Sequence, residues 1–202
     1  MPPDAALDLR YEQLKDRSVD DAEYQARRKA WLAGGVTVED YLLGRLEGET
    51  DPVLQGDVLQ ILGRLRFHGG RRLPETAAWA RRLIHSDVAS VRCRALWVLG
   101  WVGGADDLAV LTQALDGDDN PENRGWAATA MMQLFLSDET TQAVWLGPLK
   151  QALHREKDEG ALEKVLISLQ EISGTKLGLK ASTHAPAPKA KLDAALKKAL
   201  KL

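Results

Sequence analysis

An internal repeat constrains the fold of this chain more than any other feature of its sequence. Four similar segments begin near residues 51, 90, 123 and 163. Two apolar positions recur in register, at separations of 37, 32 and 38 residues: Leu62, Leu99, Met131 and Leu169 at one, and Val58, Ala95, Ala127 and Val165 at the other. Self-similarity at this period is typical of an array of supersecondary units that share a core with their neighbours.

Each of these segments follows another segment with apolar residues at helical spacing. Leu108, Leu111 and Leu115, for example, recur at steps of three and four residues, which is the period of an α-helix. The predicted first helices are 38–46, 75–84, 106–115 and 141–153, and the predicted second helices are 51–63, 90–100, 123–132 and 163–170. No stretch alternates between apolar and polar residues, so we expect an all-α chain with essentially no β-strand.

Proline and glycine indicate where the helices begin and end. Asp51-Pro52 and Asn120-Pro121 each place a capping side chain before a proline at the first helical position, where its missing N–H costs nothing. Gly174 follows a predicted helix end, where a residue that tolerates positive φ is favoured. Pro148 lies inside an apolar pattern, so we expect it to kink or break its helix.

The two ends of the chain differ from the repeats. Residues 4–16 and 20–33 predict two helices, which we expect to cap the apolar end of the stack. Residues 176–202 contain seven lysines and one acid, whereas residues 1–175 contain 20 basic and 28 acidic residues. The predicted helix at 189–202 carries Leu192, Leu196 and Leu200 on one face, and we expect it to be mobile or loosely docked.

Composition narrows the class of protein further. The 202 residues carry a formal net charge of −2 with 45% hydrophobic residues, which is typical of a globular protein. The single cysteine, Cys93, excludes an internal disulfide framework. No apolar run approaches the roughly 20 residues needed to span a bilayer, and the first residues lack a secretory signal pattern. We therefore expect a cytoplasmic protein.

The segment from Val91 to Gly103 resembles the second helix of HEAT-like repeats of the PBS-lyase type. In that family the helix reads roughly Asp-Pro-x-Val-Arg-x-x-Ala, followed after two or three residues by Leu-Gly. Matches in the neighbouring segments are Asp51-Pro52 and Leu62-Gly63 before it, and Arg124, Ala127 and Ala128 after it. The fourth segment lacks the arginine, has Gln170 in place of the glycine and matches in its apolar register alone. The resemblance covers about residues 37–174.

This resemblance implies a right-handed α-α superhelix, an armadillo-like solenoid of about five helix pairs. The implied organisation is a capping helix pair at 1–36, HEAT-like repeats at 37–178, a linker at 179–188 and the basic helix at 189–202. In such an array the second helices line the concave face. Families built this way include scaffolds, inhibitors, lyases and DNA-repair enzymes, so the resemblance specifies the fold better than the function.

Candidate binding residues are the second-helix positions that remain once the apolar register is assigned to the core. With Val91, Ala95 and Val98 inside, the outward positions of that helix are Arg94, Trp97 and Trp101. The repeat register transfers them to Asp57, Gln60 and Arg64 in the segment before, and to Trp126, Thr129 and Gln133 in the segment after. Tryptophan and arginine are frequent interface anchors, so we predict a partner-binding patch. The alternative is that a strongly curved stack buries these indoles between repeats.

Signals of catalysis are weak. The four histidines lie far apart without a helical metal-binding spacing, and the chain contains no His-Glu pair, unlike the HEAT-like iron hydroxylases. Cys93 has Arg92 and Arg94 beside it, which would favour a thiolate, but its place in the repeat suits a small packed residue. The acidic turn at 116–122 has the composition of a solvated turn, or of a surface that attracts a basic partner. We expect no cofactor, no metal and no catalytic residue.

The predicted function is therefore non-catalytic protein binding, in which the concave face grips another protein or peptide. An adaptor or an inhibitor, for example an immunity protein that blocks a toxin, would suit a small acidic HEAT-like protein. The alternative from another class is a HEAT-like DNA glycosylase, in which the tryptophans and Asp57 would form the site. The acidic body would repel a phosphate backbone, so binding of nucleic acid is not expected. A bilin lyase is a third reading, suggested only by the family's name.

Overall fold

The computed structural model describes residues 3–137, 142–180 and 187–202, and these residues form helices and connections without a strand. They pack as two compact units, Met1–Val98 and Leu99–Leu202. The boundary falls inside one helix, α6 (Ala89–Val102). The prediction of an all-α helical repeat fold is confirmed.

Unit 1 contains the capping helices and the first repeats. Its elements are α1 (Pro3–Lys15), α2 (Asp21–Ala30), η1 (Trp31–Gly34), α3 (Gly35–Gly48), α4 (Pro52–Leu65), η2 (Arg66–His68), α5 (Leu73–Leu83) and the first part of α6. The two helices expected at 4–16 and 20–33 thus correspond to α1 and to α2 with η1. The ring of Trp31 stacks on Tyr41 of α3, with centroids 5.9 Å apart, and the Tyr11 hydroxyl donates a hydrogen bond of 2.8 Å to Glu49. These contacts attach the capping helices to the first repeat.

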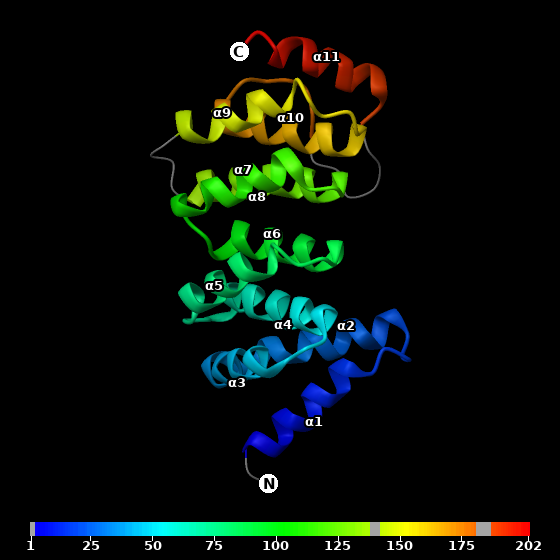
Figure 1. Ribbon diagram of the computed structural model, residues 1–202, viewed down its shortest axis with the longest axis vertical. Coiled ribbons are helices and arrows are strands. Elements are labelled where there is room, and N and C mark those ends of the chain that lie inside the picture. Colours follow the sequence, from blue (N-terminus) through cyan, green and yellow to red (C-terminus); the bar gives the residue numbers. More distant parts are fainter. Residues whose placement is uncertain (1–2, 138–141, 181–186) are drawn as a thin grey trace. The chain divides into compact units, whose positions relative to one another are not determined.

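Unit 2 contains the later repeats and the C-terminal helix. After the end of α6 come η3 (Ala105–Asp107), α7 (Leu108–Gly117), α8 (Pro121–Ser137), α9 (Gln142–Ala152), α10 (Glu159–Ser173) and α11 (Lys189–Ala199). In Figure 1 the pairs α7–α8 and α9–α10 form successive layers, and α11 lies against the second of them. Thr141, where the sequence predicted a helix to begin, and residues 181–186 of the linker predicted at 179–188 lie outside the described residues.

The C-terminal helix packs more closely than the sequence analysis expected. Leu192, Ala195 and Ala199 of α11 are buried. The backbone N–H of Ala187 donates a hydrogen bond of 3.0 Å to the buried carboxylate of Glu163, and Lys189 forms an ion pair of 2.6 Å with Glu159. Small alanines alternate with leucine on the inner face, so α11 can approach α10 closely. The expectation of a mobile or loosely docked helix was wrong for these residues.

The helix boundaries agree with the capping pattern, with one exception. Asp51 accepts a hydrogen bond of 2.9 Å from the N–H of Val53, Asn120 accepts one of 2.9 Å from Glu122, and Gly174 ends α10 at φ 71°. Pro148, however, lies within the continuous helix α9. The expected break is absent because Trp145 and Leu149 on the same helix are buried in the core and hold the turn in place despite the missing hydrogen bond.

A hydrogen bond of the same kind recurs at the start of successive second helices. Arg92 donates a bond of 2.9 Å to the carbonyl of Ser86, and Arg124 donates one of 2.8 Å to the carbonyl of Asp118. In the repeat before them, Gln55 donates one of 2.7 Å to the carbonyl of Glu49. Each donor reaches the carbonyl six residues before it. These polar side chains therefore tie each second helix to the turn that precedes it.

A small residue recurs one position after these donors. Gly56, Cys93 and Gly125 occupy equivalent places, and all three are buried. A Cβ atom at Gly125 would lie 3.2 Å from the Cα of Ala161 on α10, and one at Gly56 would lie 3.6 Å from the Cα of Val91 on α6. The second helices therefore approach each other closely at Gly56 in unit 1 and at Gly125 in unit 2. Cys93 is buried, as its place in the repeat suggested.

Candidate functional site

The nine predicted binding residues are here called the outward row after their position in the repeat, and they belong partly to unit 1 (residues 57 to 97) and partly to unit 2 (residues 101 to 133). They differ in exposure. Asp57 and Gln60 of α4 are 1% and 5% exposed. Arg64 on the same helix is exposed, and Arg94, Trp97, Trp101, Trp126, Thr129 and Gln133 are partly exposed. The expectation that Asp57 and Gln60 face outward was therefore wrong.

Helix α2 covers Asp57 and Gln60. The Tyr24 hydroxyl donates a hydrogen bond to the Asp57 carboxylate, and the guanidinium of Arg28 donates one to the side-chain oxygen of Gln60. Burial, together with the hydrogen bond to Asp57, raises the pKa of Tyr24 to about 12, so the phenol remains a donor. The register of α4 placed both residues on the correct side, but the sequence did not show that α2 packs over that side.

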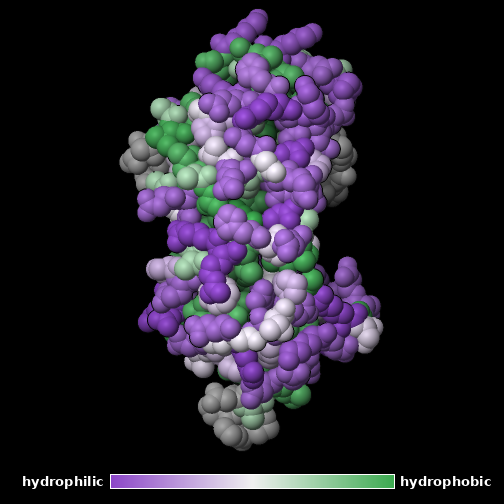
Figure 2. Space-filling model, in the orientation of Figure 1, coloured by the Kyte–Doolittle hydropathy of each residue, from purple (hydrophilic) through white to green (hydrophobic). Residues whose placement is uncertain are grey.

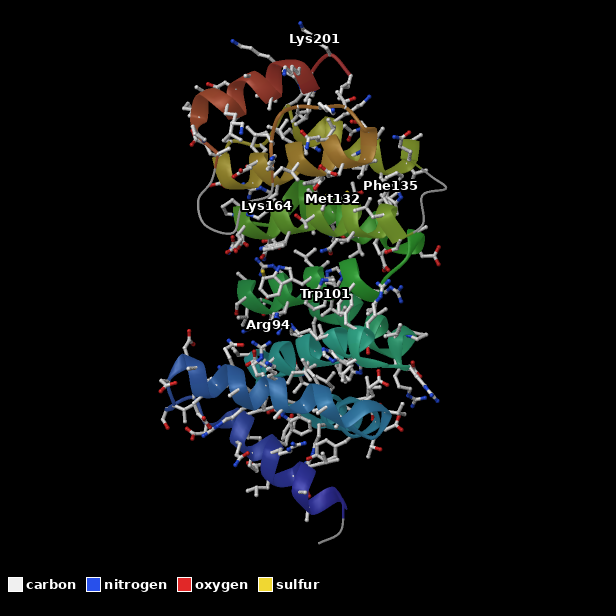
Figure 3. The ribbon with its side chains drawn as sticks, turned by 180° about the vertical axis from the view of Figure 1, so that it is seen from behind. Arg94, Trp101, Met132, Phe135, Lys164 and Lys201 are labelled. Atoms are coloured by element: carbon white, nitrogen blue, oxygen red, sulfur yellow. The ribbon has the colours of Figure 1, made fainter. Side chains whose placement is uncertain are left out.

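The Asp57 carboxylate is also paired with arginine from α6. Arg94 approaches Asp57 at 3.0 Å and Arg17 approaches it at 3.8 Å. The stem of Arg94 crosses α4 at Gly56, where an added Cβ would lie 3.1 Å from the Arg94 Cδ. Figure 3 shows Arg94 between α6 and α4. The enclosed Asp57 thus serves as an internal counter-ion in unit 1.

In unit 2, helix α8 carries three members of the outward row: Trp126, Thr129 and Gln133. The indole N–H of Trp126 donates a hydrogen bond of 3.3 Å to Glu122 one turn before it. The ammonium group of Lys164 on α10 lies 5.5 Å from the centroid of the indole ring, a distance typical of a cation–π contact. Figure 3 shows the Lys164 side chain directed from α10 towards α8. The indole is therefore held in place while part of it remains accessible.

Sequence reasoning missed Lys164. The register shift of 38 residues that relates Ala127 to Val165 also relates Trp126 to Lys164 and Thr129 to Ile167, so the signal was present in the repeat. The fourth segment lacks the arginine and the glycine of the motif, so its apolar register alone indicates this equivalence. Lys164 and Ile167 are both partly exposed, which adds them to the same surface of unit 2.

The six tryptophans separate according to the helix that carries them. Trp31 of η1, Trp79 of α5 and Trp145 of α9 are 1%, 9% and 2% exposed. All three belong to the cap or to first helices. Trp97 and Trp101 of α6 and Trp126 of α8 belong to second helices, and all three are partly exposed. The tryptophans of the cap and the first helices are thus buried, whereas those of the second helices keep part of their surface accessible.

The acidic turn of unit 2 forms one wall of a small cavity. About 230 Å³ in volume, it is lined by the turns after α7 and α9, including Asp116, Arg124 and Glu156. Arg124 makes two hydrogen bonds to Glu156, of 2.7 and 2.9 Å, and Arg155 pairs with Asp116. Asn123 donates to Asp118 within the turn at 3.2 Å. Asp116 and Glu156 therefore each have an arginine partner within unit 2.

A second cavity, in unit 1, lies between the first helices α3 and α5. It has a volume of about 590 Å³, and its lining includes Gly44, Glu47, Arg72, Trp79 and Arg82. The Arg82 guanidinium lies 4.0 Å from the centroid of the Trp79 ring, and Arg72 pairs with Asp40 and Glu75 at 3.1 Å each. Its charges are mostly paired within the cavity.

No group of three histidine, cysteine, aspartate or glutamate side chains is placed to hold a metal ion within the described part of the chain. Nor is any described helix long and apolar enough to cross a membrane. On the face shown in Figure 2, hydrophilic side chains predominate over both units. The partly or fully exposed members of the outward row offer indole, amide, hydroxyl and guanidinium groups, and Lys164 adds an ammonium group.

Residues 39–132 match the family model of HEAT repeats. This stretch of the chain is similar to HEAT repeats. Comparisons with curated proteins and with solved structures found no match for the chain. The matched stretch begins in α3 and ends in α8, so it includes every residue of the outward row except Gln133. HEAT repeats commonly serve as scaffolds for protein interaction and offer extended binding surfaces.

Proposed function

We propose that this chain is a non-catalytic binding protein that holds a partner protein through the outward row of its second helices. The observation that carries the proposal is the separation of the tryptophans. Those on the cap and first helices are core residues, whereas Trp97, Trp101 and Trp126 keep part of their surface accessible. In helical-repeat arrays the second helices line the concave side that binds partners, and we propose the same use here.

The chemistry of the row supports binding of a protein. Partly exposed indoles provide large, rigid contact areas and are the residues most often found as interface hot spots. Thr129 and Gln133 lie on the same helix as Trp126 and add hydrogen-bonding groups. Lys164 adds a positive charge beside the Trp126 ring. An adaptor or an inhibitor, including an immunity protein, would use such a surface without any catalytic group.

The position of Asp57 argues against the alternative of a DNA glycosylase. Its carboxylate is 1% exposed and is already paired with Arg94, so it is not presented to a nucleotide. Residues 99–175 contain five basic and thirteen acidic residues, which would repel the phosphate backbone on which DNA affinity depends.

The proposal is tested by capturing the partner with the full chain, identifying it and measuring its affinity for purified variants. We expect Trp126→Ala to weaken binding by about thirtyfold, the loss typical of a hot-spot side chain, with little change in the unfolding midpoint. Val144→Ala, at an exposed apolar residue of the first helix α9, is the matched control and should bind normally.

Two outcomes would overturn the proposal. In one, Trp126→Ala unfolds at a markedly lower temperature but binds the partner as before, which would make the indole a core residue. In the other, the chain captures no protein and instead binds duplex DNA with strong salt dependence, which would favour the repair enzyme.

A further inference from the structure

We propose that Arg28, Arg64 and Arg94 of unit 1 form an oxyanion-binding site, here called the arginine site, that receives a carboxylate side chain of the partner protein. The inference rests on the proposed function and adds the chemistry that the partner must present. It is carried by the charges and hydrogen bonds around Asp57 and Gln60.

The arginine site contains more positive than negative charge. Asp57 is its only carboxylate among the described residues, and that group already faces Arg94, Arg17 and Tyr24. Arg94 and Arg64 act on Arg28 electrostatically: burial first, and then the charges of these two arginines, lower the pKa of Arg28, while Asp57 opposes the change. One enclosed carboxylate therefore serves several guanidinium groups.

Arg28 is the central member of the site. Arg28 is only 9% exposed. Its guanidinium donates hydrogen bonds to the neutral side-chain oxygens of Gln25 and Gln60. No carboxylate of the described chain forms an ion pair with it. The charge of Asp57 favours the ionised guanidinium of Arg28 but forms no direct ion pair with it. A buried charge without a directly paired counter-ion is costly, so an added anion would be stabilised there more than at an exposed arginine.

Unused donors lie in the same place. The Nε atoms of Arg28 and Arg94 are buried and have no hydrogen-bond partner within the described residues. Arg64, one turn after Gln60 on α4, is exposed and makes no ion pair with any part of the chain that the structure describes. Guanidinium groups bind carboxylates in bidentate geometry with charge-assisted hydrogen bonds. The exposed Arg64 would meet the incoming group, and Arg94 and Arg28 would stabilise it.

The surroundings favour an acidic protein segment over a nucleic acid. Residues 1–98 contain fifteen basic and fifteen acidic residues, so unit 1 as a whole carries no excess of positive charge. A phosphate backbone needs a continuous basic track. One or two carboxylates on a partner's surface can be bound by the arginine site alone. Trp97 on α6 lies nearby and offers an apolar contact.

The test uses the full chain and a fluorescein-labelled twelve-residue peptide of alternating glutamate and serine, measured by fluorescence anisotropy. The peptide with glutamine in place of glutamate is the matched probe. We expect the glutamate peptide to bind at least about tenfold more tightly than the glutamine peptide, and Arg64→Ala to weaken its binding about tenfold, as for loss of one charge-assisted hydrogen bond. Arg28→Met, which keeps the length but removes the charge, should weaken it at least as much.

Arg82→Ala is the matched control, because Arg82 is also exposed in unit 1 but lies on α5 in the cavity between α3 and α5. It removes the same charge and should change affinity by less than about twofold, the scale of a screened surface charge. Since Arg64 is exposed, its replacement keeps the test valid even if Arg28→Met lowers stability.

Three results would overturn the site: equal binding of the two peptides, equal effects of Arg64→Ala and Arg82→Ala, or inorganic phosphate or a twelve-base-pair duplex binding while the glutamate peptide does not. The captured partner separates this failure from failure of the proposed function. If Trp126→Ala loses the partner while Arg64→Ala keeps it, the proposed function stands and the arginine site falls. If both variants keep it, both fall.

Discussion

At the scale of single residues, the turns between first and second helices depend on side chains that bond to the backbone. Glu49 and Glu156 lie at equivalent places in their repeats, and each accepts hydrogen bonds from the N–H groups of the next two residues. Glu156 also receives the two bonds from Arg124. The arginine was recognisable as part of the family pattern, but its partner 32 residues later was not, because no local rule links them.

The Arg124–Glu156 pair should make stability depend on acid pH. Burial by itself opposes ionisation of Glu156, but the hydrogen bonds from Arg124 and from the backbone of Asp158 and Lys157 hold its pKa below the ordinary 4.5. Its stabilising contribution is therefore fully present above pH 4.5 and is lost as the pH falls through the lower folded pKa. We expect Glu156→Gln to lower the free energy of unfolding at pH 7 by about 2 kcal/mol and by less at pH 3.

Chemical denaturation of both proteins between pH 3 and 7 checks this expectation. Glu171→Gln, at an exposed residue of α10, serves as the control and should follow the native protein at every pH. A constant difference between the native protein and Glu156→Gln across this range would contradict the assigned role of the ion pair.

At the scale of helices, the close approach of second helices depends on glycine at positions 56 and 125. Periodicity predicted each helix and its buried stripe, and the structure confirms these helices. Periodicity could not predict where two helices touch, since the crossing point is set by the packing of both. Gly125 shows this, because its open side faces the backbone of Ala161.

Gly125→Val should destabilise the chain by about 1–3 kcal/mol, the usual cost of overpacking a close contact. The added methyl groups would push α10 from α8 and displace the stem of Lys164, whose Cδ would lie 2.8 Å from a Cβ at this position. Thermal unfolding measures the loss. Gly147→Val on α9, where a Cβ meets open space, is the control. If both variants unfold at the same temperature, the crossing at Gly125 is not tightly packed.

At the scale of the whole molecule, the formal net charge is close to zero, but acidic and basic residues are concentrated in different sections of the chain. The strongly acidic section 99–175 and the basic C-terminal section both belong to unit 2, and α11 packs against α10 there. Two contacts link these sections. Lys189 forms an ion pair with Glu159, and Lys150 donates a hydrogen bond of 2.7 Å to the carbonyl of Leu202. Helix α11 therefore closes the last repeat with apolar contacts and partly balances its charge.

Leu192→Asp should release α11 from α10, because it places a carboxylate at a site that is 2% exposed and unpaired burial of charge is strongly unfavourable. Amide hydrogen exchange in α11 should then rise by at least about tenfold, while the other helices of unit 2 stay protected. Leu200→Asp makes the same chemical change on the same helix at a residue that is 48% exposed. Its exchange should remain native-like, and equal exchange in both variants would show that α11 is not held by its inner face.

The sequence by itself determined the helices, their pairing and the residues of the apolar register. These features follow from local periodicity and capping, which act within a few residues of the chain. It also placed Trp126, Thr129 and Gln133 on one surface, because a register carried by a repeat transfers from one helix to the next.

The tertiary structure alone decided which outward positions remain accessible. Asp57 and Gln60 share their register with Arg94 and Trp97, yet they are buried because the capping helix α2 packs over α4 and supplies Tyr24 and Arg28. Exposure depends on every neighbour that a residue meets in space, and a contact between residues more than 30 positions apart leaves no trace in local periodicity. The buried Arg28, and with it the proposed arginine site, became visible only when those distant segments were brought together.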